Sequence, residues 1–253
     1  MKVIADTWLV FRRHMTITLH NPAWVVIGLV QPVLYLVLFA PLLKSIAGVR
    51  GFPAGGAYNV FVPGLLIQLG LFGSAFVGFS LIAELRGGVV ERLRVTPVSR
   101  LALLLGRALR DVVNLLVTSL LLVLLSVPFG LVLHPVGLAV VFALLALIGL
   151  MFASLSYALA LWVQSEDAFA PILTTVTLPL LLLSGVLLPL SLAPVWLRDV
   201  AAVNPLSYAV DAARAVFNDH LGDASVPEGV AIMAVLAVAS VVIAARRFSR
   251  TAA

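Results

Sequence analysis

The sequence has 253 residues, of which 62% are hydrophobic and 11% are charged. Soluble domains are about 45–50% apolar and about 25% charged, so this composition excludes an ordinary soluble domain and indicates a helical membrane protein. The absence of cysteine excludes disulfides, thiol catalysis and cysteine-ligated metals in this chain. The net charge of +5 is the kind that marks a cytoplasmic membrane face, and we expect no nucleic-acid partner.

Residues 1–22 predict an amphipathic helix on the cytoplasmic side. Its apolar face contains Ile4, Trp8, Phe11 and Met15, spaced as on one side of a helix. Its charged face contains Lys2, Asp6 and Arg13. The pattern fits a helix lying in the membrane interface, and it fits equally a helix packed against the membrane bundle.

Residues 23–253 predict one all-α membrane domain with six transmembrane helices, because each span needs about 20 mostly apolar residues. The six segments are Trp24–Leu43, Val60–Ile82, Asp111–Leu133, Val136–Val163, Phe169–Leu190 and Gly229–Ala245. With six spans, both termini lie on the same side as the second and fourth connections. That side holds 12 Lys and Arg residues against 4 on the other, so the positive-inside rule places both termini in the cytoplasm.

The second connection contains the most charged stretch of the chain, ELRGGVVERLRVTPVSR at residues 84–100. Leu85, Val89 and Leu93 repeat at helical spacing, and we expect an amphipathic helix from about Glu84 to Val95. Thr96-Pro97 should end it, and Ser99 should cap the next helix. Such a helix could present charges to a soluble partner, or the stretch could be a solvated cytoplasmic loop.

The fifth connection, about 191–228, predicts two short helices outside the cell. Pro194 can occupy the first turn of one, and Asn204-Pro205 ends it. The second helix should run from about Pro205 to His220. Ser184-Gly185 and Pro189 predict a bend or break in the outer half of the preceding span.

Small and polar residues inside the spans suggest helix contacts and a transport pathway. Gly70, Ser74 and Gly78 form a small-residue face that allows close helix approach, either to this chain or to a second copy. Most polar side chains in the spans should form packing hydrogen bonds. Our candidates for pathway lining are Gln68, Asn114, Thr174, Thr175 and Thr177. We expect no catalytic residues, bound cofactor or metal in this chain.

Two motifs resemble a known family. The stretch 84–100 is similar to the cytoplasmic coupling region of type-2 ABC transporter (ABC-2) permeases, particularly those of daunorubicin-resistance type. The shared residues are Glu84, Gly87, Glu91-Arg92-Leu93 and Thr96-Pro97-Val98-Ser99-Arg100. Residues 188–214 resemble the outer helical hairpin of that family, with its P-x-W-L and N-P-L elements. The six spans and the N-terminal helix also fit, so the resemblance covers nearly the whole chain.

The resemblance implies roles for particular residues. A coupling helix at about 83–100 would contact an ATPase through Glu84, Arg86, Gly87, Glu91, Arg92, Leu93, Arg94, Thr96, Pro97 and Arg100. An extracellular hairpin at about 188–220 would form a gate with Pro189, Pro194, Trp196, Leu197, Asn204 and Pro205.

The resemblance also implies partners. Two copies of a cytosolic ABC ATPase would bind ATP and Mg²⁺, and a second permease chain would complete a pathway in the inner membrane of the cell. A Walker A loop needs a lysine after its glycines. The only lysines here are Lys2 and Lys44, and neither follows such a loop.

The sequence therefore predicts the membrane subunit of an ATP-driven exporter for an amphipathic drug, antibiotic or lipid. Two alternatives stay open, an ABC exporter of a glycan or polysaccharide and a secondary transporter or channel that needs no ATPase. The scarcity of charged residues inside the spans argues against a proton-coupled antiporter.

Overall fold

The computed structural model describes residues 2–20, 23–46, 56–88, 98–187 and 189–250. All the regular elements in these ranges are helical, which confirms the predicted all-α membrane fold. The α-helices are α1 (Lys2–Leu19), α2 (Ala23–Ile46), α3 (Gly56–Ala75), α4 (Gly78–Arg86), α6 (Arg100–Ser126), α7 (Pro135–Val163), α8 (Glu166–Leu182), α9 (Val195–Ala201), α10 (Pro205–Phe217) and α11 (Ser225–Arg250). Two short 3₁₀-helices are η1 (Val127–Phe129) and η2 (Leu190–Leu192).

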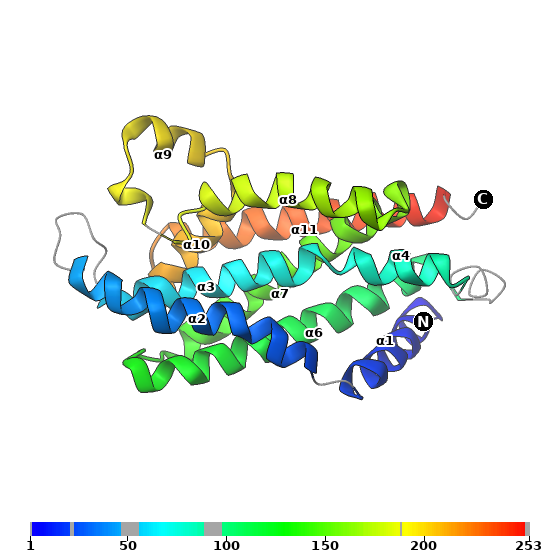
Figure 1. Cartoon of the computed structure of the whole chain (residues 1–253), viewed down its shortest axis with the longest axis horizontal. Coiled ribbons are helices and arrows are strands. Elements are labelled where there is room, and N and C mark those ends of the chain that lie inside the picture. Colours follow the sequence, from blue (N-terminus) through cyan, green and yellow to red (C-terminus); the bar gives the residue numbers. More distant parts are fainter. Residues whose placement is uncertain (1, 21–22, 47–55, 89–97, 188, 251–253) are drawn as a thin grey trace.

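The long helices form an elongated bundle with two distinct ends (Figure 1). α1, the last residues of α4 and the C-terminal part of α11 lie at one end, which we call the terminal end because both chain termini are there. α9 and α10 lie at the opposite end, which we call the hairpin end. The long helices α2, α3 with α4, α6, α7, α8 and α11 run between the two ends.

Within the described residues, four stretches are long and apolar enough to cross a membrane, namely Tyr58–Arg86, Arg100–Phe129, Pro135–Val163 and Ser225–Phe248. A shorter apolar stretch, Val25–Phe39, lies in α2. The remaining predicted span corresponds to α8, which has 17 residues and a length of about 25 Å at 1.5 Å per residue.

Several span boundaries differ from the sequence prediction, and the differences are largest at the start of α6 and the end of α8. α6 begins at Arg100 and not at Asp111, because the charged residues in its first turns are buried and paired inside the protein instead of lying in a loop. α8 ends at Leu182 and not at Leu190, because the chain turns there and Gly185 adopts a φ of 73°, a left-handed conformation that favours glycine.

The second predicted span is broken in the middle. α3 ends at Ala75 and α4 begins at Gly78, so backbone groups near Phe76 and Val77 lack their regular helical partners. Ser156 of α7 meets this need from both sides: its hydroxyl donates to the Ala75 carbonyl and accepts from the Gly78 amide at 2.9 Å. An apolar bundle tolerates a broken helix only when neighbouring groups satisfy the freed backbone in this way.

α3 is the central helix of the bundle, buried from Tyr58 to Leu71. The small-residue face of α3 and α4 packs against α7 of the same chain. A Cβ atom placed on Gly70 would lie 3.1 Å from the Ile148 side chain, and one placed on Gly78 would lie 2.7 Å from the Ser156 carbonyl oxygen. Ser74, between them, is fully buried.

Gly78→Ala should destabilise the protein by about 1–3 kcal/mol, because the added methyl group overlaps the backbone of α7 at the point where Ser156 satisfies the helix break. Gly28→Ala is the matched control, since the nearest atom to its new Cβ lies 3.8 Å away, at an ordinary contact distance. Unfolding of the two variants in mild detergent would measure the difference. Equal stability would show that the close approach at Gly78 is not required.

Candidate functional site

Charged side chains join four helices near the terminal end of the bundle. Arg107 of α6 is 2% exposed and forms an ion pair with Glu84 of α4. Its Nη2 atom makes that contact, while its Nε and Nη1 atoms have no hydrogen-bond partner in the part of the chain that the structure describes. The stability of a protein with a buried guanidinium and one carboxylate partner depends strongly on that partner, because its loss leaves an unpaired buried charge.

A second cluster lies one helical turn further along α6. The Asp111 carboxylate accepts a hydrogen bond from the Tyr157 hydroxyl of α7 and lies 3.1 Å from Nε of Arg110. Tyr157 is fully buried. A third contact is more exposed: Arg86 at the end of α4 pairs with Glu166 at the start of α8 over 3.4 Å. These contacts connect α4 to α6 and α8, and α6 to α7.

α1 packs closely on the first turns of α6. A Cβ atom on Gly106 would lie 2.7 Å from the Val10 side chain and 2.9 Å from the Thr7 carbonyl oxygen, so only glycine allows this approach. The Asp6 carboxylate also accepts a hydrogen bond from the backbone amide of Ser99 at 3.4 Å. α1 is therefore attached to the start of α6 by both packing and hydrogen bonding.

The packed face of α1 is not the apolar face that the sequence singles out. Ile4 is 76% exposed and Trp8 is 61% exposed, while Phe11 and Met15 are half-buried. α1 thus packs on the bundle through one side and leaves a large apolar surface on another. This arrangement combines the two placements that the sequence allowed, packing against the bundle and lying in the membrane interface.

His14 faces the charged residues beneath α1. Its pKa is lowered to about 3 by burial first, and then by the positive charges of Arg107, Arg110 and Arg13. Because this pKa lies far below neutral pH, His14 is uncharged there and adds no further positive charge to the cluster.

The predicted coupling helix begins differently from the sequence expectation. Glu84 and Arg86 lie in the last turn of α4 and not in a separate helix starting at Glu84. Gly87 caps α4, and Gly88 has a φ of 67°, a conformation that favours glycine and ends the helix. Glu91, Arg92, Leu93, Arg94, Thr96 and Pro97 lie outside the described residues. Arg100 begins α6, and the prediction that Ser99 caps it is confirmed, because the Ser99 hydroxyl accepts from the Ala102 amide at 3.1 Å.

The hairpin end contains the two short helices predicted for the fifth connection. Pro194 precedes α9, where Trp196 is exposed and Leu197 is half-buried. Asn204 caps α10 by accepting from the Leu206 amide at 3.0 Å, and its amide group donates to the Leu180 carbonyl of α8 at 2.7 Å.

The prolines of the predicted gate hold end positions of helices. Pro205 occupies the first position of α10, as a helix N-terminus favours. Pro189 stands directly before η2.

Arg214 of α10 is a structural residue that the sequence did not single out. It is buried, and its guanidinium donates to the carbonyls of Val60 at 3.0 Å, Gly185 at 2.7 Å and Val186 at 3.3 Å. Burial lowers its pKa to about 10, against the opposing attraction of Asp211. The sequence signal for a buried Arg214 was its position among alanines on the apolar face of an amphipathic helix.

Comparison with known proteins identifies the family. The model of the ABC-2 type transporter family matches residues 5–218, which extend from α1 through α10. This chain belongs to the ABC-2 type transporter family.

Several relatives carry transport names. A Pyropia yezoensis protein named as transport permease ycf38 is 30% identical over 78% of this chain and 69% of its own length. DrrC of Mycobacterium tuberculosis, named as a doxorubicin resistance ABC transporter permease, is 28% identical over 83% of this chain and 76% of its own. The daunorubicin resistance ABC transporter permease DrrB1 of Streptomyces coeruleorubidus is 25% identical over 80% of this chain and 71% of its own.

The candidate pathway residues of this ABC-2 protein do not share one surface. Gln68 is buried in α3, and its Oε1 atom has no hydrogen-bond partner among the described residues. Thr177 is also buried and donates to the carbonyl of Leu173, whereas Thr174 and Thr175 are exposed on α8. Asn114 is half-buried in α6. The exposed threonines and the buried Gln68 thus occupy different environments.

Glu84→Leu should cost about 3–5 kcal/mol of stability, because it leaves the buried Arg107 charge without a partner. The double variant Glu84→Leu/Arg107→Leu should recover much of this loss, since it removes both charges. Glu166→Gln is the control, because the Arg86–Glu166 pair is exposed and should contribute about 0–1 kcal/mol. Chemical unfolding of the purified variants provides the measurement. A loss for Glu84→Leu no larger than that for Glu166→Gln would contradict this account.

Proposed function

We propose that this chain is the membrane-spanning permease subunit of an ABC exporter that moves an amphipathic drug, antibiotic or lipid out of the cytoplasm or the inner leaflet. The observation that carries the proposal is the family match over residues 5–218. The relatives named for doxorubicin and daunorubicin resistance support a drug-like substrate. The mostly apolar helices suit a substrate with a large apolar part.

The energy for transport comes from a separate polypeptide in this proposal. Neither Lys2 nor Lys44 follows a glycine-rich phosphate-binding loop. Two copies of a cytosolic ATPase would bind ATP and Mg²⁺. A second permease chain, identical to this one, would complete the pathway, because one chain supplies a single bundle with no clear internal repeat.

Coupling to the ATPase would act through the end of α4 and the stretch that follows it. Glu84 and Arg86, in the last turn of α4, pair with α6 and α8 respectively. A displacement of this end by a bound ATPase would therefore act on both helices. It would act more strongly on α6, because the Glu84–Arg107 pair is the more buried of the two.

The same proposal places the terminal end in the cytoplasm of a cell with this protein in its inner membrane. The distribution of Lys and Arg supports this orientation. α1 would then lie at the cytoplasmic surface, with exposed Ile4 and Trp8 available to lipid. α9 and α10 would face the outside.

Purification of the tagged chain from its native host tests the proposal directly. We expect an ABC ATPase to co-purify in mild detergent, and we expect substrate export to stop when ATP is depleted. Transport that survives ATP depletion, with no ATPase bound, would instead support a secondary transporter or channel.

Glu91→Ala/Arg92→Ala in the reconstituted complex should lower substrate-stimulated ATP turnover and leave the chain folded in the membrane. The reason is that these charges are expected to pair with the ATPase. Arg198→Ala, in α9 at the other end of the bundle, is the matched control and should leave turnover unchanged. Normal turnover in the double variant would exclude this stretch as the coupling contact.

A cysteine-accessibility experiment tests the orientation. The chain has no natural cysteine, so Gly222→Cys and Arg250→Cys each introduce a single thiol. In intact cells, a membrane-impermeant maleimide should label the first thiol and not the second. Labelling of both or of neither would overturn the predicted topology, provided that both thiols react in permeabilised cells.

A further inference from the structure

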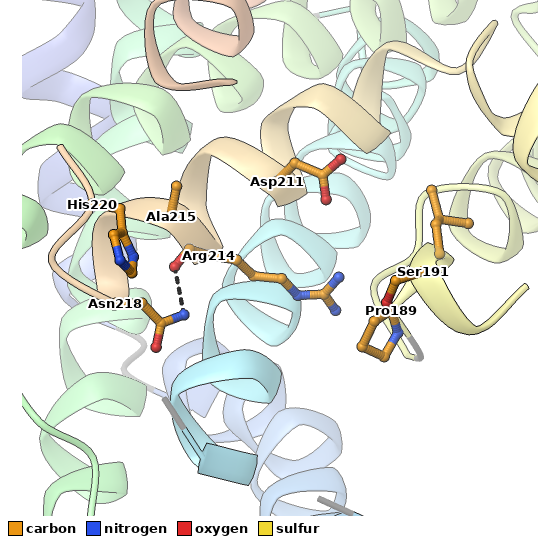
Figure 2. Close-up of a pocket in the computed structure, with 8 residues that line it drawn as sticks. Pro189, Ser191, Asp211, Arg214, Ala215, Asn218 and His220 are labelled. Atoms are coloured by element: carbon orange, nitrogen blue, oxygen red, sulfur yellow. Dashed lines mark hydrogen bonds between the residues drawn. The ribbon is translucent and has the colours of Figure 1, made fainter. Parts of the chain in front are cut away.

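A pocket of about 340 Å³ opens at the hairpin end of the bundle, between α10 and the segment around η2 (Figure 2). Its polar side chains from α10 and the residues after it include Asp211, Arg214, Asn218 and His220. Pro189 and Leu190 contribute apolar surface from the opposite side. The pocket therefore combines a few polar side chains of one helix with apolar surface, as ligand sites commonly do.

Three of these residues repeat along one face of the helix. Asp211, Arg214 and Asn218 are spaced three and four residues apart, so they lie on neighbouring turns. Figure 2 shows the Arg214 guanidinium pointing across the pocket toward Pro189 and Ser191. This arrangement places a carboxylate, a guanidinium and an amide in a row beside one cavity.

The row has unused hydrogen-bonding capacity. Arg214 is buried and fixed by three carbonyls through Nε and Nη2, while Nη1 makes no hydrogen bond within the described part of the chain. The Asn218 amide nitrogen donates to the Arg214 carbonyl at 2.9 Å, but its Oδ1 atom is buried and receives no donor from the described residues. A buried acceptor without a donor is uncommon in proteins, and a small rotation of the Asn218 side chain would let a ligand hydroxyl satisfy it.

The charges of the pocket favour a ligand without a net charge. The positive charge of Arg214 attracts an anion, but it lies beside the carboxylate of Asp211, which repels one. A simple cation is attracted by the Asp211 carboxylate and repelled by Arg214. A hydroxyl group avoids both, because it donates to a carboxylate or amide oxygen and accepts from a guanidinium.

We propose that this pocket binds the saccharide part of a ligand, with Asp211 and Asn218 accepting hydrogen bonds from sugar hydroxyls and Arg214 donating to a sugar oxygen. Pro189 and Leu190 contact the apolar face of the sugar ring. The role of this ligand as exported cargo rests on the proposed function, and the binding step itself requires neither ATP nor an ATPase. A glycosylated amphipathic substrate would have its sugar held here at the outer end of the bundle.

Saturation-transfer NMR on the full chain in lipid nanodiscs tests the proposal, with maltotriose as the probe. We expect saturable binding of maltotriose, and no binding of inorganic phosphate or phosphoethanolamine at the same concentrations. The sample contains no maltoside detergent, ATP or ATPase. A chain that binds no maltotriose, or that binds either phosphate compound instead, would overturn the proposal.

Variants locate the binding in the pocket. Asp211→Ala should weaken maltotriose binding about tenfold, the value of one charge-assisted hydrogen bond, whereas Asp211→Asn keeps an acceptor oxygen and should retain most of the affinity. Asp199→Ala, on α9 and outside the pocket, is the matched control and should bind normally. Unaltered binding by Asp211→Ala would place the site elsewhere and refute the proposal.

A second variant tests the same pocket without removing a polar group. Ala215→Phe fills the pocket with an aromatic ring and leaves its polar groups in place, and it should also abolish maltotriose binding. Each variant must show the unfolding temperature of the parent chain before its binding is interpreted. Because ATPase co-purification is measured separately, failure of sugar binding and failure of the exporter proposal give different results.

Discussion

The bundle depends on satisfying polar backbone groups where its helices break inside an apolar environment. Ser156 does this between α3 and α4, where it bonds to the groups of Ala75 and Gly78. Arg214 does it beyond α8, where it donates to the carbonyls of Gly185 and Val186. Lipid offers no water to bond with such groups, so each break can exist only because a side chain from another helix reaches it.

The two ends of the bundle are held together by different kinds of interaction. Arg214 ties α10 to α3 and to the turn after α8, so the hairpin end is held by hydrogen bonds from a charged guanidinium to backbone carbonyls, with a pocket beside it. The terminal end is held by ion pairs between helices, such as Glu84–Arg107. In the proposed exporter, the two ends need different properties: contact with a soluble ATPase at one and contact with released substrate at the other.

Sequence reasoning found the helices and the hairpin because their signals are local. Apolar runs define the spans, and Asn204-Pro205 marks the start of α10 as predicted. It misplaced the start of α6, because Arg107 and Asp111 look like loop residues until their partners are known. Those partners, Glu84 and Tyr157, are distant in sequence, and no local pattern reveals them. The role of Arg214 was missed for the same reason.

The break at residues 76–77 also has a mechanical consequence. α4 has nine residues and is about 13 Å long, so a tilt of roughly 10° about the break shifts its far end by about 2 Å. α3 is buried along nearly its whole length and need not move during such a tilt. The second span can therefore move in two parts: α3 stays in place, while a tilt of α4 carries the buried Leu81 and Ile82 with it and displaces the helices packed against them.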